Sequence, residues 1–121
     1  MSTMQVELVK PDGRLWSGEA SFVFARTKSG EIGVLPHHIP LMAQLVDDAP
    51  IRIDGVDGES LTFAVDGGFL SVSDKVVTIL AEDAVVAADI DVDAAQRDAA
   101  SDDPKRQARA RARLRAVGKS D

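Results

Sequence analysis

The residues best suited to chemistry lie in one stretch, residues 30–41, which reads Gly-Glu-Ile-Gly-Val-Leu-Pro-His-His-Ile-Pro-Leu. One glutamate and two adjacent histidines supply the carboxylate and imidazole groups that bind zinc and other transition metals. Adjacent residues of a strand point to opposite faces, however, so the rings of His37 and His38 diverge. No further ligand follows at a useful spacing. We therefore expect no metal site.

This stretch, called the central motif below, is stiff. Pro36 and Pro40 forbid a helix between them, and Gly33 lets the strand expected at residues 32–35 bend or be approached closely. The segment between the prolines carries both histidines. A preformed tip of this kind is better suited to gripping a partner than to closing over a substrate.

The sequence offers no catalytic arrangement. It contains no Ser/His/Asp set, no Gly-x-Ser-x-Gly elbow and no two carboxylates placed by spacing for acid and base work. Asp66-Gly67-Gly68 reads as a turn, because it lacks the helix and the lysine of a phosphate-binding loop. With no cysteine, thiolate chemistry is excluded too. We expect a protein without catalytic residues.

Charge is distributed unevenly along the 121 residues, whose formal net charge is −6. Residues 1–103 hold 7 Lys+Arg against 19 Asp+Glu, or −12, and residues 104–121 hold 7 against 1, or +6. Such a basic tail either binds an anionic partner or folds back on its own acidic body. The tail arginines are Arg106, Arg109, Arg111, Arg113 and Arg115.

Two other interpretations of the tail are a nucleic-acid site and a plain solvated helix. The arginine spacing does not forbid nucleic acid, but the acidic body repels phosphates and the tail has no stacking aromatic residue. We expect no nucleic-acid partner. An alanine-rich helix that packs on its own body without a regulatory role stays open.

Short strands are the elements that must position these residues. Residues 5–9 alternate polar and apolar side chains, the period of a half-buried strand, and Pro11-Asp12-Gly13 ends it in a turn. Similar runs follow at residues 20–25, 32–35, 41–46, 51–53, 60–65, 69–72 and 76–80. Runs this short predict a β-sandwich, or flattened antiparallel barrel, over residues 1–86. We place Trp16 and the four phenylalanines in its core or at the core edge.

Residues 87–121 are expected to form an α-helical hairpin after a small-residue linker at residues 84–88. Asp91 reads as the cap of the first helix, and Asp103 with Pro104 opens a second helix over residues 104–117. Its arginines 106, 109 and 113 would share one face. Its apolar face is thin, consisting of Ala110, Leu114 and Val117, so we expect a weakly held, detachable tail.

Several motifs follow one another in a fixed order along nearly the whole chain. They are Trp16-Ser17-Gly18, the central motif, Ala64-Val65-Asp66-Gly67-Gly68-Phe69-Leu70, Leu80-Ala81-Glu82 and Ile90-Asp91. Each is weak alone, but in this order and spacing the chain resembles the epsilon subunit of bacterial F-type ATP synthases, of the actinobacterial type. The resemblance implies a non-catalytic subunit of the central stalk, which couples c-ring rotation to ATP synthesis and restrains ATP hydrolysis through its C-terminal helices.

The resemblance also implies partners and a location. Glu31 occupies the position that meets the c-ring, and the gamma-subunit contact falls on Pro36, His38, Pro40 and Leu41. The tail arginines would suit an acidic loop of the beta subunit. Because no segment approaches the roughly 20 apolar residues of a membrane span, we expect no direct membrane insertion, but peripheral attachment at the cytoplasmic face of the bacterial plasma membrane. Without the resemblance, Glu31 and His38 would read as ordinary surface residues.

A nucleotide cofactor is not expected. In family members that bind ATP, the first helix opens with Ile/Leu-Asp-x-x-Arg-Ala. Ile90 and Asp91 match the first two positions of that pattern, but Ala94 stands where the arginine should be. The resemblance therefore predicts that this chain does not bind ATP.

Overall fold

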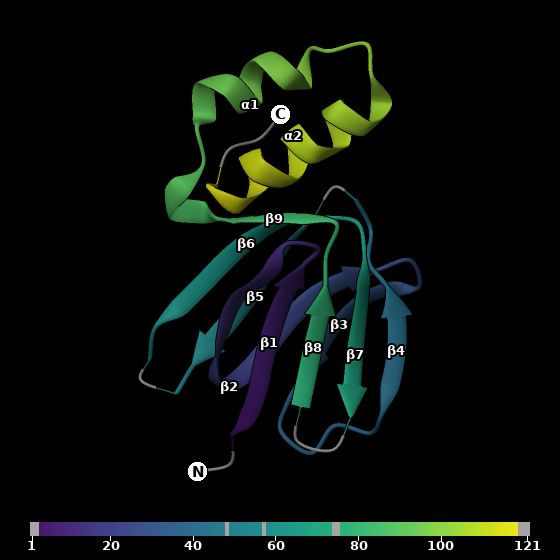
Figure 1. Ribbon diagram of the computed structural model, residues 1–121, viewed down its shortest axis with the longest axis vertical. Coiled ribbons are helices and arrows are strands. Elements are labelled where there is room, and N and C mark those ends of the chain that lie inside the picture. The colour runs from purple at the N-terminus through teal and green to yellow at the C-terminus, as the bar shows by residue number, and fades with distance from the viewer. Residues whose placement is uncertain (1–2, 48, 57, 74–75, 119–121) are drawn as a thin grey trace.

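The computed structural model describes residues 3–47, 49–56, 58–73 and 76–118 and shows a β-sandwich with two packed helices at one end (Figure 1). The predicted sandwich with a C-terminal helical pair is confirmed. A 3-10 turn at Ala87–Asp89 joins the two parts. The strands are β1 (Met4–Lys10), β2 (Gly13–Thr27), β3 (Gly30–Val34), β4 (Leu41–Gln44), β5 (Pro50–Gly55), β6 (Ser60–Asp66), β7 (Phe69–Ser73), β8 (Val76–Leu80) and β9 (Asp83–Val86), and the helices are α1 (Val92–Ala99) and α2 (Pro104–Ala116).

The strands pair in the order β4-β7-β8-β1-β2-β5-β6-β9, and β3 pairs with β2. The long β2 serves both layers: it pairs first with β1 and then with β5 and β3. A register irregularity between Ala20 and Phe22 marks the change of partner, as expected where a strand bends. β1 and β8 run parallel, so the expectation of a purely antiparallel barrel is wrong at that pair. The two strands are distant in sequence, and no hairpin imposes their direction.

Every second side chain of a strand points inward, and these side chains fill the space between the two layers. On β1 the side chains of Val6 and Leu8 are fully buried, while Glu7 between them is partly exposed. Phe63 lies in the core, with its ring centroid 6.3 Å from that of the half-buried Trp16. Phe69 is 46% exposed, so its placement in the core is wrong. Leu70 and Val72 take the inward positions of β7, which turns Phe69 outward.

The start and end of the tail differ slightly from the expectation. Residues 83–86 form β9 against β6, so the linker predicted at residues 84–88 is wrong over its first half. The caps are confirmed: the carboxylate of Asp91 accepts from Ala94 N (3.1 Å) and that of Asp103 from Lys105 N (3.0 Å). α2 ends at Ala116, and none of the described helices is long and apolar enough to cross a membrane.

Candidate functional site

The central motif runs along the sandwich rather than forming one tip. Near its start, Lys28 N donates to Gln44 O (2.8 Å) and Leu45 N to Gly68 O (2.9 Å), which places the hairpin between β2 and β3 at the end that carries the helices. The connection from β3 to β4 follows the other end of β3, beside the first residue of β1 and the ends of β7 and β8. Figure 1 shows the N-terminus at this end, opposite the helices. The two halves of the motif therefore face opposite ends.

The connection between β3 and β4 is a tight turn over Leu35, Pro36, His37 and His38. His38 N donates to Leu35 O (3.1 Å), and His37 has a φ of 71°, the left-handed conformation required after a proline in a type II turn. His37 is the one non-glycine residue in the described chain with a positive φ. Strain of about 1–2 kcal/mol accompanies this conformation. Pro36 thus occupies the first central position of the turn, where its fixed φ favours this geometry.

Three large apolar side chains at this end are exposed. Leu35 is 59%, Ile39 74% and Met42 70% exposed. Leu35, His37, His38 and Ile39 also line a cavity of about 460 Å³. We call the exposed side chains of residues 35–42 the turn patch. Three exposed apolar side chains within eight residues make this end of the sandwich a candidate interaction surface.

Glu31 lies away from the turn patch. It faces Arg26 across the strand pair, with the Glu31 carboxylate 3.2 Å from the Arg26 guanidinium. Together with Arg115 and Gly118 at the end of α2, both residues line a cavity of about 600 Å³. Glu31 and His38 therefore do not share one tip, because the five residues of β3 place them at opposite ends of that strand.

The prediction that another group closely approaches the backbone at Gly33, in the middle of β3, is confirmed. A Cβ atom built there would lie 2.8 Å from Cζ of Phe22, whose ring covers the glycine. The guanidinium carbon of Arg52 lies over the same ring, 5.6 Å from the ring centroid. This packing uses the outer face of β2, β3 and β5, since Val23 and Ala25 take the inward positions.

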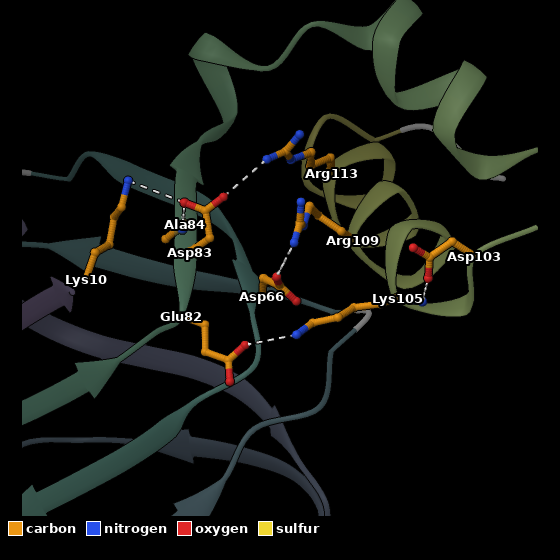
Figure 2. A network of polar contacts seen from close by, with 9 residues as sticks. All are labelled: Lys10, Asp66, Glu82, Asp83, Ala84, Asp103, Lys105, Arg109 and Arg113. Atoms are coloured by element: carbon orange, nitrogen blue, oxygen red, sulfur yellow. Dashed lines mark hydrogen bonds and ion pairs between the residues drawn. The ribbon is translucent and has the colours of Figure 1, made fainter. Parts of the chain in front are cut away.

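The basic tail folds back on the acidic body. Figure 2 shows side chains from successive turns of α2 reaching acidic side chains at the end of the sandwich. This row of contacts, called the tail interface below, settles which surface the tail covers in the free chain. Its ion pairs are Lys105 with Glu82 (3.4 Å), Arg109 with Asp66 (3.0 Å) and Arg113 with Asp83 (3.6 Å).

The row of ion pairs begins at Lys105, four residues before Arg109, and does not include Arg106, which the sequence places on the same helical face as Arg109 and Arg113. Arg106 is exposed. The apolar side of α2 is as thin as predicted but different in detail: Ala110, Ala112 and Leu114 are buried, and Val117 is only half-buried.

Asp66 is the residue that sequence reasoning missed. It was assigned to a turn, but it is the last residue of β6, 5% exposed, and it accepts from both Nε and Nη2 of Arg109 through its Oδ2 atom. Register pairing places it opposite Asp83 of β9. Two features of the sequence could have indicated this contact. The strand at residues 60–66 ends in an aspartate, and residues 105, 109 and 113 of the second helix are basic and share one helical face.

The positions linked to nucleotide binding are used for folding. The Asp91 carboxylate caps α1, and Ile90 is half-buried directly before that cap. Ala94 supplies the capped N–H and brings no positive charge for a phosphate. No group of three or more His, Cys, Asp or Glu side chains within the described ranges lies close enough together to hold a metal ion.

Comparison with known proteins identifies relatives along the whole chain. Residues 3–87 match the family described as ATP synthase, Delta/Epsilon chain, beta-sandwich domain. The sequence is 57% identical to the ATP synthase epsilon chain of Mycobacterium avium (strain 104) and 55% identical to that of Mycolicibacterium smegmatis, in each case over 121 residues and 100% of both chains.

Solved structures share the fold. A chain of the mitochondrial ATP synthase of Euglena gracilis, in a structure of its OSCP, F1 and c-ring, aligns with a TM-score of 0.69 at 22% identity, over 98% of this chain and 81% of that one. A chain of the central stalk and c-ring of the Tetrahymena thermophila enzyme aligns with a TM-score of 0.66 at 18% identity, over 94% and 96%. At these identities the likeness shows the fold alone.

Proposed function

The chain belongs to the family of ATP synthase epsilon chains, which are non-catalytic subunits of that enzyme, and from this premise we propose how its surfaces work in the complex. It sits in the central stalk of a proton-translocating F-type ATP synthase and couples rotation of the c-ring to ATP synthesis in the catalytic head. Its helices restrain ATP hydrolysis. The observation that carries this proposal is 57% identity over the full length to an epsilon chain.

The turn patch is the proposed contact with the gamma subunit. Pro36 and Pro40 hold its shape, His38 and the exposed Ile39 lie between them, and Leu41 follows at the start of β4, partly buried against the core. A rigid surface loses little conformational entropy on binding, and burying one isoleucine contributes about 1.5–3 kcal/mol. Stiffness and exposed apolar area together support a permanent contact that transmits torque.

Glu31 is the proposed contact with the c-ring. Its carboxylate is exposed at the hairpin between β2 and β3, and Arg26 beside it limits its movement. Since this hairpin and the turn patch lie at opposite ends of β3, one compact body can hold two partners at once. A subunit that links two parts of a rotor needs this separation.

The tail supplies the proposed restraint on hydrolysis. While it is docked, Arg109 and Arg113 are engaged with the sandwich. An acidic loop of the beta subunit can use these two arginines only after α2 leaves. The two positions of the tail thus compete for the same charges, which is the basis of a switch.

Nucleotide is not part of this mechanism. With Asp91 capping α1 and Ala94 in the place of an arginine, we propose that the tail responds to its protein neighbours rather than to bound ATP. The subunit acts as a peripheral component at the cytoplasmic face of the bacterial plasma membrane, held there by gamma and the c-ring.

Ile39→Asp tests the proposal at the turn patch. The variant places a charge where an apolar contact is expected, and we expect at least about a tenfold weaker association with gamma. Val56→Asp is the matched control, because Val56 is also exposed but lies on a different connection, after β5. Co-purification with gamma and the c-ring from membranes measures both. Equal assembly of Ile39→Asp and the unchanged chain would contradict the assignment.

A further inference from the structure

Asp66 is the one buried charged residue within the described ranges. It lies at the end of β6, where α2 covers it, and Arg109 donates to its Oδ2 atom from Nε (3.1 Å) and Nη2 (3.0 Å) (Figure 2). A buried carboxylate is stable only when its charge is compensated, because desolvation of an unpaired ion is costly. The docked position of α2 therefore both creates the burial of Asp66 and supplies its counter-charge.

The second oxygen of this carboxylate has no compensating partner. Oδ1 of Asp66 is buried and accepts no hydrogen bond from the described protein atoms. The cavity beside Asp66, which Arg109, Ala112 and Arg113 also line, measures only about 10 Å³, the space of one water molecule at most. The carboxylate thus depends on Arg109 for its compensation.

A second carboxylate makes this dependence stronger. Asp83 lies directly opposite Asp66 in the pairing of β6 with β9, and like charges in that position repel. Lys10 of the sandwich binds Asp83 (3.3 Å), and Arg113 adds a longer contact (3.6 Å). With α2 docked, two carboxylates meet three cations, whereas with α2 released only Lys10 remains.

We propose that Asp66 is a charge-gated anchor for the tail: α2 docks only when the Asp66 charge is cancelled, and Arg109 is the group that cancels it. The two partners differ in exposure, with the Arg109 side chain 39% and the Asp66 side chain 5% exposed. If the carboxylate is neutralised, Arg109 turns to solvent and the helix stays. If the arginine is removed, Asp66 regains water only when the helix lifts away.

The other two ion pairs of the tail interface have a smaller effect on the equilibrium between docked and released α2. Lys105 and Glu82 are both more than half exposed, and Arg113 meets a carboxylate that Lys10 already compensates. The exposed pair of Lys105 with Glu82 contributes little, typically under about 1 kcal/mol. The inference therefore singles out one pair among three.

Amide exchange of α2 in the full chain tests the anchor. Arg109→Gln should raise the exchange rates of the Ala110, Ala112 and Leu114 amides by about 100-fold, because removing one partner of a buried pair strands the other. Asp66→Asn should change them by less than about threefold, and the double variant should exchange about as slowly as Asp66→Asn. Arg106→Gln, an exposed arginine of the same helix, is the matched control and should change nothing.

The order of these effects decides the outcome. Equal acceleration by Asp66→Asn and Arg109→Gln, no acceleration by either, or no rescue in the double variant would overturn the anchor. Unchanged exchange in β1 and β8 shows that the sandwich stays folded in each variant. Exchange in the free chain does not depend on the proposed function. Amide exchange in the free chain and ATP hydrolysis by the assembled enzyme are separate readouts, so the anchor can stand where the proposed restraint fails.

Discussion

Replacing Gly68 with alanine should destabilise the sandwich far more than the small size of the change suggests. Gly68 joins β6 to β7 with a φ of +114°, and a Cβ atom there would lie 1.9 Å from the carbonyl oxygen of Leu80. That oxygen belongs to backbone held on both sides, because Leu80 pairs with Phe69 of β7 and with Val9 of β1. The alanine therefore cannot be accommodated by rotating a side chain.

The expected cost has two parts. The positive φ adds strain of about 1–3 kcal/mol. A carbon atom normally stays roughly 3.3 Å from a carbonyl oxygen, so the backbone must also shift by more than about 1 Å, at an additional cost of about 1–3 kcal/mol. Gly13→Ala carries only the first part, because Gly13 has a φ of +133° with nothing within 4 Å of its Cβ position. The difference between the two variants isolates the clash at Gly68.

Urea unfolding followed by circular dichroism and by the fluorescence of Trp16 measures this difference. We expect Gly68→Ala to be about 1–3 kcal/mol less stable than Gly13→Ala, equivalent to a melting temperature roughly 4–12 °C lower for a domain of this size. If the two variants unfold within about 0.5 kcal/mol of one another, a margin typical of neutral surface substitutions, the contact with Leu80 does not constrain the turn and the reasoning is refuted.

Three further predictions concern the proposed partners and the tail. Glu31→Lys should weaken docking on the c-ring and lower proton-driven ATP synthesis in membrane vesicles, and full activity of this variant would disprove the role. The double variant Arg26→Glu with Glu31→Arg is the control: it keeps an ion pair between the two strands but removes the carboxylate from position 31, so it separates the two effects. Amides of α2 should exchange faster than those of β1 and β8, and more so at high salt, because the pair of Lys105 with Glu82 is solvent-exposed and that of Arg113 with Asp83 is partly so; slow, salt-independent exchange would contradict a detachable tail. Calorimetry should detect no ATP binding at millimolar nucleotide, since Ala94 offers no charge, and a saturable isotherm would reverse that conclusion.

Local features of the fold were predictable from the sequence because they depend on neighbouring residues. The alternation in β1, the capping aspartates Asp91 and Asp103, and the sharp turn at Pro36 each follow from a few consecutive side chains, and the structure confirms them. The excess of arginine after residue 103 likewise indicated a tail with an anionic partner, either its own body or another chain.

Which face of each strand points inward could not be predicted from the sequence and is decided by the assembled layers. Period-two alternation puts Phe22 and Phe24 on one side of β2 and Val23 on the other, but it does not say which side meets the second layer. The smaller residues face inward, and the rings of Phe22 and Phe24 meet Arg52 on the outside.

The sequence alone thus predicted the kinds of elements in this protein and their order, apart from β9, and the family they point to. Only the tertiary structure separated Glu31 from His38, because a strand turns nearness in sequence into opposite ends of a sheet. It also joined Asp66 to Arg109 across 43 residues, and that pairing depends on where α2 lies on the sandwich. Local patterns carry no information about contacts between distant segments, and in this chain those contacts decide how the tail is held.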